Sequence, residues 1–324
     1  MSKKIIKITF FLLGGALLIF WITQLGLKNI FHTLGGLGLW TLALLGISLL
    51  WNLFYSMGWS LLIKNNKGFF RLLKIKIMSE AVALMTPFNF ALGDPVRYFL
   101  IKSDKNETHG SAIVADRFIH TLASLFHVLI GLIALFIFHY GIPHFISAVL
   151  VSIYFLLFLF IAKACHLAFQ GEDILLKRIL EWSLLNRFIF FQRLKIKFLE
   201  SISGLKEIGF SYPAFLLHWL GRFLGTIEIG CIFWYLYGSP HWLISLVLSS
   251  LTSVVHLFFS FIPGALGLVE GLYAAFFMLN GLNAQTGLAM QMIRRSRFLF
   301  WVLIGYLLFY LEVKPHPLRQ HKKT

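Results

Sequence analysis

Long apolar runs, separated by short polar and basic stretches, dominate the pattern along this chain. A transmembrane helix needs about 20 predominantly apolar residues to cross the hydrocarbon core. The first run follows a basic start, as a signal peptide would, but it is longer than an h-region and no A-x-A cleavage signal follows it, so we interpret it as an uncleaved span. The runs predict six spans, at about residues 8–25, 38–63, 111–139, 145–165, 212–237 and 286–312.

Two further apolar stretches contain helix-breaking and charged residues. The first, at 77–101, is interrupted at Pro87 and is too short for two crossings. We therefore predict a re-entrant hairpin that dips to the middle of the membrane and turns back. The second, at 243–280, is interrupted at Pro263 and has longer limbs. Its pattern leaves open whether it is re-entrant or forms two full spans.

The composition agrees with a membrane protein. Apolar residues make up 58% of the chain and charged residues 13%, whereas soluble domains average about 45–50% and 25%. This balance excludes a soluble globular, disordered or fibrous chain. The predicted fold class is an all-α polytopic membrane protein, with about six full transmembrane helices plus two re-entrant or broken helical hairpins that form an inverted repeat.

The basic residues predict the orientation. With the hairpins returning to the side they left, 23 Lys and Arg residues fall in cytoplasmic segments and only Lys28 falls in an outer loop. Such a bias indicates that both termini lie in the cytoplasm. A full crossing at 77–101 would move Lys102 and Lys105 outside, so the bias also favours the hairpin. We expect a multi-pass protein of the cell (inner, cytoplasmic) membrane.

The two interrupted stretches resemble each other. Residues 86–94 read TPFNFALGD and residues 262–270 read IPGALGLVE, so each contains a proline, a Leu-Gly pair and a carboxylate. Proline and glycine are common in transmembrane helices, and one break would mean little. Two breaks in matching positions, entered from opposite sides, indicate an inverted repeat around a transporter's central site. The predicted hinge and helix-breaking residues are Pro87, Gly93, Pro263, Gly264 and Gly267.

We interpret residues 1–324 as a single integral membrane domain. Repeat half one covers about 38–165, half two covers about 211–312, and a basic tail occupies 313–324. Between the halves, 166–210 alternates basic and apolar residues at helical spacing, which is typical of an amphipathic helix on the inner leaflet. A connector packed on the base of the bundle is the alternative.

Ionisable residues inside the apolar segments are the candidates for function, because such groups are costly at membrane depth. A helix that restarts after a break exposes N–H groups, which favour an anion. Pro95 fits the first position of a helix capped by Asp94, and Arg97 lies one turn further. The predicted substrate-binding residues are Asp94, Arg97, Asp116, Arg117, Glu270, Arg294 and Arg297.

Three neighbouring arginines close the second half of the chain. Successive residues on a helix differ in direction by about 100°, so the three cannot face one partner. We predict that Arg294 and Arg297 point inward, towards Glu270 or an anionic ligand, and that Arg295 points to lipid headgroups. Guanidinium suits bidentate contact with phosphate.

Other charged and polar groups can be explained by structural roles that involve no substrate. Arg117 could extend to the membrane surface along its aliphatic stem. Glu228 and Arg222 lie six residues apart on one helix, too far for a direct pair, and each is expected to face the bundle interior. Four histidines are interpreted as satisfied polar contacts rather than proton relays: His120, His127, His218 and His256.

Motifs for soluble catalysis are absent from the sequence. There is no nucleotide-binding loop, no H-E-x-x-H and no G-x-S-x-G, and the two cysteines, Cys165 and Cys231, lie in apolar runs. We therefore expect no metal, no cofactor and no enzymatic activity, and ATP-driven transport by this chain alone is excluded. The basic excess is interpreted as orientation and anionic lipid, with no nucleic acid as partner.

At these motifs the chain resembles the lysylphosphatidylglycerol synthase transmembrane region family, which comprises flippase-like membrane proteins. The resemblance covers about residues 5–312. IPGALGLVEG at 262–271 is similar to the family signature P-G-x-L-G-x-x-E-G, and GDPVRYFL at 93–100 is similar to its G-[DE]-x-x-R stretch. Asp116-Arg117 and the Arg294–Arg297 segment with Gly305 resemble its arginine-bearing helices. Phe88-Asn89-Phe90 stands where many members carry glycines.

The resemblance implies the lipid-translocating part without the soluble synthase domain. Members are linked to anionic phospholipid, hopanoid and polyprenyl-linked pathways, so the resemblance does not choose the lipid, and a homo-oligomer is left open. We expect a protein that binds and translocates an anionic lipid or lipid-linked headgroup across the membrane by alternating access. Two alternatives remain: an intramembrane transferase with Asp94, Asp116 or Glu270 as base, and a non-transporting scaffold in lipid or envelope biogenesis.

Overall fold

The computed structural model describes residues 36–63, 68–85, 90–101, 108–172, 200–259, 262–265 and 267–313. Within these ranges all regular secondary structure is helical, which confirms the predicted all-α class. The predicted span at 8–25, Pro87 and most of the 166–210 connector lie outside the described residues. Of the helices in these ranges, four are long and apolar enough to cross a membrane: α3 (Leu39–Ser60), α6 (Thr108–Phe138), α7 (His144–Gln170) and α11 (Tyr212–Tyr237).

A fifth long helix, α14 (Ala284–Val313), covers the predicted span at 286–312. Its arginines lower its hydropathy, but its 30 residues measure about 45 Å, more than the hydrocarbon core requires. The other predicted spans match their helices within a few residues, except that α7 continues to Gln170 and so takes up the start of the predicted connector. The short helix α10 (Leu205–Ile208) lies near the other end of this predicted connector and packs against α6 and α7.

The first interrupted stretch forms a hairpin of α4 (Phe69–Met85) and α5 (Phe90–Ile101). The helix α4 begins at Phe69, before the predicted start at residue 77. Three basic residues that the prediction placed in a cytoplasmic loop therefore lie in the first turns of this helix. Its 17 residues and the 12 of α5 measure about 26 Å and 18 Å, less than the thickness of the hydrocarbon core. The two limbs pack side by side, which fits a re-entrant hairpin.

Two details of this hairpin differ from the prediction. Because α5 begins at Phe90, Asp94 is not its cap and Pro95 lies in the second turn, where it can donate no N–H to the preceding turn. Gly93 lies inside the helix and not at the break. A Cβ at Gly93 would stand 2.8 Å from the Cβ of Ala83, so this glycine allows α4 and α5 to approach closely.

The second interrupted stretch consists of α12 (Trp242–Phe258), the 3-10 turn η2 (Pro263–Ala265) and α13 (Leu268–Leu279). Gly264 and Gly267 have φ angles of 57° and 78°, the left-handed region that glycine adopts at little cost. The 12 residues of α13 span about 18 Å, too short for a full crossing. The sequence left open whether this stretch is re-entrant or forms two full spans, and the helix lengths favour a re-entrant hairpin.

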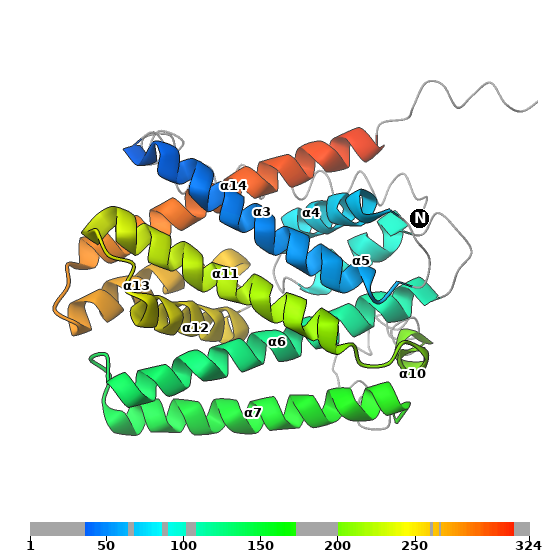
Figure 1. Ribbon diagram of the computed structural model, residues 1–324, viewed down its shortest axis with the longest axis horizontal. Coiled ribbons are helices and arrows are strands. Elements are labelled where there is room, and N and C mark those ends of the chain that lie inside the picture. Colours follow the sequence, from blue (N-terminus) through cyan, green and yellow to red (C-terminus); the bar gives the residue numbers. More distant parts are fainter. Residues whose placement is uncertain are drawn as a thin grey trace, which may run out of the picture.

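The two hairpins enter the bundle from opposite ends (Figure 1). The α4–α5 hairpin begins and ends near the start of α6, whereas the α12–α13 hairpin begins and ends near the end of α6. A hydrogen bond ties the second hairpin to that end, since the side chain of Asn280 donates to the carbonyl of Tyr140 at 3.3 Å. Inside the bundle the hairpins meet, because α4 contacts η2.

Helices α3–α6 and α11–α14 correspond in order and length. The first hairpin limbs have 17 residues each, the second limbs 12 each, and the long helices that follow have 31 and 30. Each long helix packs on the first hairpin limb of the other set, α6 on α12 and α14 on α4. Glycines allow both approaches, since a Cβ at Gly131 or Gly305 would stand 2.6 or 2.3 Å from the Cβ of Ser250 or Ala81.

Helix α7 lies at one edge of the bundle, beside α6 (Figure 1). Few residues in its most apolar stretch are buried, and its large apolar side chains, such as Phe145 and Leu156, are exposed. A contiguous apolar face of this kind would be unstable against water but is suited to contact with lipid. The ion pairs inside the bundle are made by residues of α4, α5, α6, α11, α13 and α14.

Candidate functional site

Asp94 and Arg117 form a partly accessible ion pair between the first hairpin and α6. Arg117, on α6, donates from Nε and Nη2 to the two carboxylate oxygens of Asp94, on α5, at 2.7 and 2.9 Å. The side chains keep 36% and 21% of their surface exposed. This bidentate pair confirms neither reading of Arg117 in full, because the guanidinium binds an inward acid while part of the side chain stays accessible.

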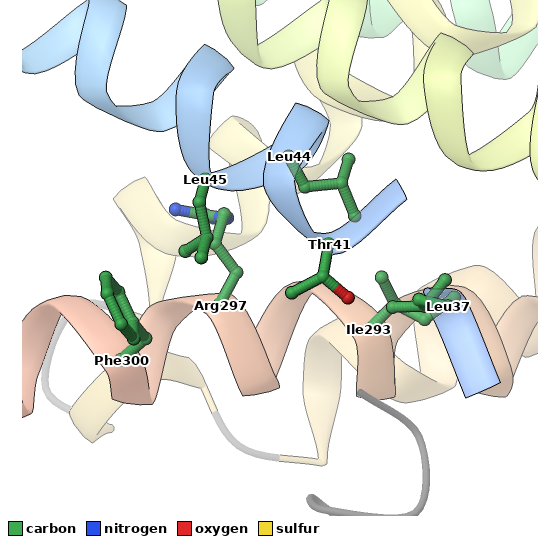
Figure 2. A pocket seen from close by; sticks show the side chains of 7 residues that line it. All are labelled: Leu37, Thr41, Leu44, Leu45, Ile293, Arg297 and Phe300. Atoms are coloured by element: carbon green, nitrogen blue, oxygen red, sulfur yellow. The ribbon is translucent and has the colours of Figure 1, made fainter. Parts of the chain in front are cut away.

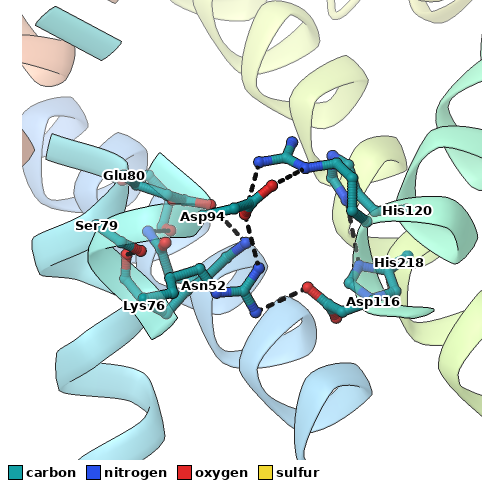
Figure 3. Close-up of polar contacts among 11 residues, drawn as sticks. Asn52, Lys76, Ser79, Glu80, Asp94, Asp116, His120 and His218 are labelled. Atoms are coloured by element: carbon teal, nitrogen blue, oxygen red, sulfur yellow. Dashed lines mark hydrogen bonds and ion pairs between the residues drawn. The ribbon is translucent and has the colours of Figure 1, made fainter. Parts of the chain in front are cut away.

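Behind this pair lies a buried network centred on Asp116, also on α6 (Figure 3). One of its oxygens accepts from Nη2 of Arg97 at 2.8 Å, and the other accepts from Nε2 of His218, on α11, at 2.9 Å. Arg97 also reaches Asp94 at 3.4 Å and lies over the ring of Trp59, 4.0 Å from its centre. The side chains of Asp116 and His218 are fully buried, so this network lies beneath the accessible pair and is closed to solvent.

The remaining charges of this first cluster lie on α4. Lys76 and Glu80 pair at 2.9 Å, one turn apart. Three cations therefore face three carboxylates, and the first cluster is electrically balanced when its histidines are neutral. Its members are Lys76, Glu80, Asp94, Arg97, Asp116, Arg117, His120 and His218, where the two histidine Nδ1 atoms lie 3.2 Å apart.

The second cluster is built around Glu228, a buried residue of α11. Arg294 and Arg297 of α14 both bind its carboxylate, Arg294 at 3.4 Å and Arg297 through its Nε. Arg294 also donates to the hydroxyl of Tyr273, on α13, at 2.9 Å. Arg297 lies over the ring of Trp51, on α3. Three helices therefore converge on one enclosed carboxylate.

Glu270 joins the second hairpin to α14 in a different way. One carboxylate oxygen accepts from Nε of Arg295 at 2.8 Å, and the other accepts from the backbone N–H of Gly267 at 2.9 Å. The acid therefore caps the start of α13 and holds an arginine of the neighbouring helix at the same time. The second cluster consists of Glu228, Glu270, Tyr273, Arg294, Arg295 and Arg297.

The prediction for the arginine triplet was wrong in its partners. Arg294 and Arg297 do share a face and point inward, but to Glu228 rather than Glu270. Arg295 does not point to lipid, since it binds Glu270 and only 8% of its side chain is exposed. The helical spacing gave the shared face correctly. It carried no information about which acid of another helix would stand opposite.

Every predicted substrate-binding residue falls in one of the two clusters. Asp94, Arg97, Asp116 and Arg117 come together in the first, and Glu270, Arg294 and Arg297 belong to the second. Sequence reasoning placed Glu228 inside the bundle without assigning it a role, and it missed His218 as a partner of Asp116. The position of Glu228 and His218 within an apolar segment was the feature of the sequence that could have identified them.

A small apolar pocket opens beside the second cluster, between α3 and α14 (Figure 2). Its volume is about 50 Å³, room for one or two water molecules, and Arg297 lines it with the apolar part of its side chain. The remaining lining is aliphatic or aromatic apart from one hydroxyl, so the pocket suits hydrocarbon better than a polar headgroup. The lining residues are Leu37, Thr41, Leu44, Leu45, Ile293, Arg297 and Phe300.

Among the described residues, no group of three His, Cys, Asp or Glu side chains is placed to hold a metal ion. The carboxylates of both clusters instead face guanidinium and ammonium groups. Arginine binds carboxylate and phosphate with the same two-pronged geometry. The arrangement can therefore exchange an internal carboxylate for the phosphate of a ligand.

Comparison with known proteins gives one match. A family model described as the lysylphosphatidylglycerol synthase TM region matches residues 4–305, nearly the whole chain. No curated protein and no solved structure matches the chain.

Proposed function

The chain belongs to the family of the lysylphosphatidylglycerol synthase TM region, and from this premise we propose that it binds an anionic lipid headgroup and moves it across the cytoplasmic membrane by alternating access. One observation carries the proposal: two short hairpins enter from opposite ends, contact each other inside the bundle, and each bears a carboxylate paired with an arginine of the following long helix. Such an arrangement is suited to a polar path through an apolar layer.

In this proposal α3–α6 and α11–α14 are an inverted repeat. The matching helix lengths and the reciprocal packing of α6 on α12 and α14 on α4 support it. So does the equivalence of Asp94–Arg117 and Glu270–Arg295, each of which joins a second hairpin limb to the next helix. Two halves of similar structure and opposite orientation can exchange conformations, so that a central site opens first to one side and then to the other.

The headgroup enters by displacing a carboxylate. Arg117 is the accessible partner of Asp94, so a phosphate can take the place of Asp94 on its guanidinium while Arg97 retains Asp94 and Asp116. The phosphate adds one negative charge to a cluster that was balanced, because the displaced Asp94 stays in the protein on Arg97. The proposed substrate-binding residues are Asp94, Arg97, Asp116, Arg117, Glu270, Arg294 and Arg297, to which the ion pairs add Glu228 and Arg295.

The acyl chains stay in the lipid phase during this movement. The pocket between α3 and α14 is about 50 Å³, too small for an acyl chain, so in this proposal the chains remain outside the bundle. The lipid is an anionic phospholipid or a polyprenyl- or hopanoid-type lipid. A transferase is less well supported, because the carboxylates of Asp94, Asp116 and Glu270 are each held by an arginine.

Leaflet exchange in liposomes tests the proposal. Purified protein is reconstituted into vesicles of phosphatidylcholine and phosphatidylglycerol that contain fluorescent phosphatidylglycerol, and a reductant added outside reports the label that reaches the outer leaflet. We expect exchange faster than in protein-free vesicles, and at least tenfold slower with Arg117→Gln. Lys163→Gln is the matched control, since it removes one charge from the exposed face of α7.

Two outcomes would contradict the proposal. The first is a lipid exchange rate with wild-type protein that is no higher than in protein-free vesicles. Equal exchange by wild type, Arg117→Gln and Lys163→Gln would mean that lipid crosses without using the arginine clusters. A new covalent lipid species found by mass spectrometry would favour the transferase instead.

A further inference from the structure

Arg222 is partly buried in the bundle and lies outside both ion-pair clusters. It is the eleventh residue of α11, about 15 Å from the first residue of the helix and so close to halfway across a membrane. Its Nη2 donates to the hydroxyl of Ser253, on α12, at 3.0 Å. It also interacts with the phenol of Tyr55, on α3. Both partners are neutral.

This environment sets Arg222 apart from the arginines of the clusters. Those five guanidiniums each contact a carboxylate at 3.4 Å or less. Among the described residues, no carboxylate lies within ion-pairing distance of Arg222. An arginine at membrane depth that lacks a counter-ion is costly, and such residues mark ligand or ion pathways.

The charge balance around it points the same way. The first cluster is neutral, but the second has three guanidiniums against two carboxylates, which leaves one positive charge over. Arg222 adds another. It stands between the clusters, since it interacts electrostatically with His120 of the first and with His256, which neighbours Glu270, Arg294 and Arg295 of the second.

We propose that Arg222 and Ser253 form the binding site of a phosphate group in the middle of the membrane, on the path between the two clusters. The proposal deepens the translocation function and rests on it. The phosphate supplies the negative charge that the protein leaves out, and guanidinium and hydroxyl groups are donors that phosphate oxygens accept well. The hydroxyl of Tyr55 lines the same site.

Phosphate chemistry comes from two sources, a phospholipid headgroup or a free phosphate ester. Binding to purified protein in detergent is measured by native mass spectrometry with three probes: dihexanoyl phosphatidylglycerol, dihexanoyl phosphatidylcholine and glycerol 3-phosphate. If dihexanoyl phosphatidylglycerol binds more tightly than glycerol 3-phosphate, the lipid is the ligand. If glycerol 3-phosphate binds more tightly, the free ester is the ligand. The variants are Arg222→Gln, Arg222→Lys and the control Lys163→Gln.

We expect Arg222→Gln to weaken binding of the preferred phosphate probe about 10- to 100-fold, the range of charge-assisted hydrogen bonds. Arg222→Lys keeps part of the affinity, and Lys163→Gln keeps all of it. A stability readout separates binding from a structural role. Removing a charge without a counter-ion leaves the melting temperature unchanged or higher, whereas Arg297→Gln lowers it by taking one of two guanidinium partners from the buried Glu228.

Unchanged phosphate binding by Arg222→Gln would overturn the site, and so would a melting temperature that falls as far as in Arg297→Gln. Failure of the translocation proposal is distinguishable from this. Phosphatidylglycerol binding that depends on Arg222, in a protein that shows no leaflet exchange, would reject translocation and leave the binding site standing.

Discussion

Glu228 holds two arginines inside the bundle, so its neutralisation gives the sharpest test of the ion-pair interpretation. In Glu228→Gln the side chain keeps its shape but loses its charge. Arg294 and Arg297 then lie one turn apart with no anion between them, and only the hydroxyl of Tyr273 and the ring of Trp51 remain as partners. Two buried like charges without compensation destabilise the folded state.

The structure sets the size of the effect. Only 1% of the Glu228 side chain is exposed, and removing one member of a buried ion pair costs about 3–5 kcal/mol. For a large domain this corresponds to a fall in melting temperature on the order of 10 °C. The assay is thermal unfolding of the purified protein in detergent, followed by tryptophan fluorescence.

Glu312→Gln is the matched control, since it removes the same charge from a pair on the surface. Glu312 binds Lys74 at 2.8 Å, but the two side chains are 45% and 37% exposed. Exposed pairs contribute about 0–1 kcal/mol, so we expect little change. If both variants melt at the same temperature, Glu228 does not hold the arginines and the interpretation of the second cluster is refuted.

Three further predictions concern the hairpins and their packing. Glu270→Ala removes both the partner of an arginine and the acceptor that caps α13, whereas Glu270→Gln keeps a neutral acceptor; we expect the alanine variant to be less stable by about 1–3 kcal/mol in the same unfolding assay, and equal stability would exclude the capping role. Gly305→Leu inserts a side chain where α14 touches α4, which should cost about 1–3 kcal/mol or more and reduce the monodisperse fraction in size-exclusion chromatography; a normal profile would mean that the helices are not closely packed. Asp94→Asn removes the bidentate acceptor of the accessible pair and should slow leaflet exchange at least tenfold; an unchanged rate would exclude this acid from the path.

The helices of this fold could be predicted because they depend on local patterns. An apolar run of about 20 residues fixes a span within a few residues, as α11 at 212–237 illustrates. The proline and glycines of the second interrupted stretch predicted a break, and η2 lies there between α12 and α13, whereas Pro87 of the first lies outside the described residues. The start of α5 was misplaced because Phe90–Gly93 continue the helix before Pro95, and a proline in the second turn is tolerated.

The partners within the site could not be predicted in the same way. That Arg294 and Arg297 share a face follows from helical geometry. Which acid they meet depends on how α11 crosses α14, and Glu228 lies 66 residues away in sequence. The same limit hid His218, whose contact with Asp116 spans 102 residues. Charge at membrane depth identifies the members of such a network, but the packing of helices selects the pairs.

Access to the middle of the bundle from both sides tests the central claim most directly. Ser253→Cys places a thiol beside Arg222 in a protein whose Cys165 and Cys231 are replaced by alanine, and a membrane-impermeant thiol reagent is added to one side of the vesicles or the other. Ser152→Cys is the control, because both serines donate to the carbonyl four residues earlier but Ser152 lies on the exposed face of α7. We predict that the Ser253→Cys thiol reacts from either side, more slowly with phosphatidylglycerol present, and that the control does not react. A Ser253→Cys thiol that reacts from neither side would contradict alternating access.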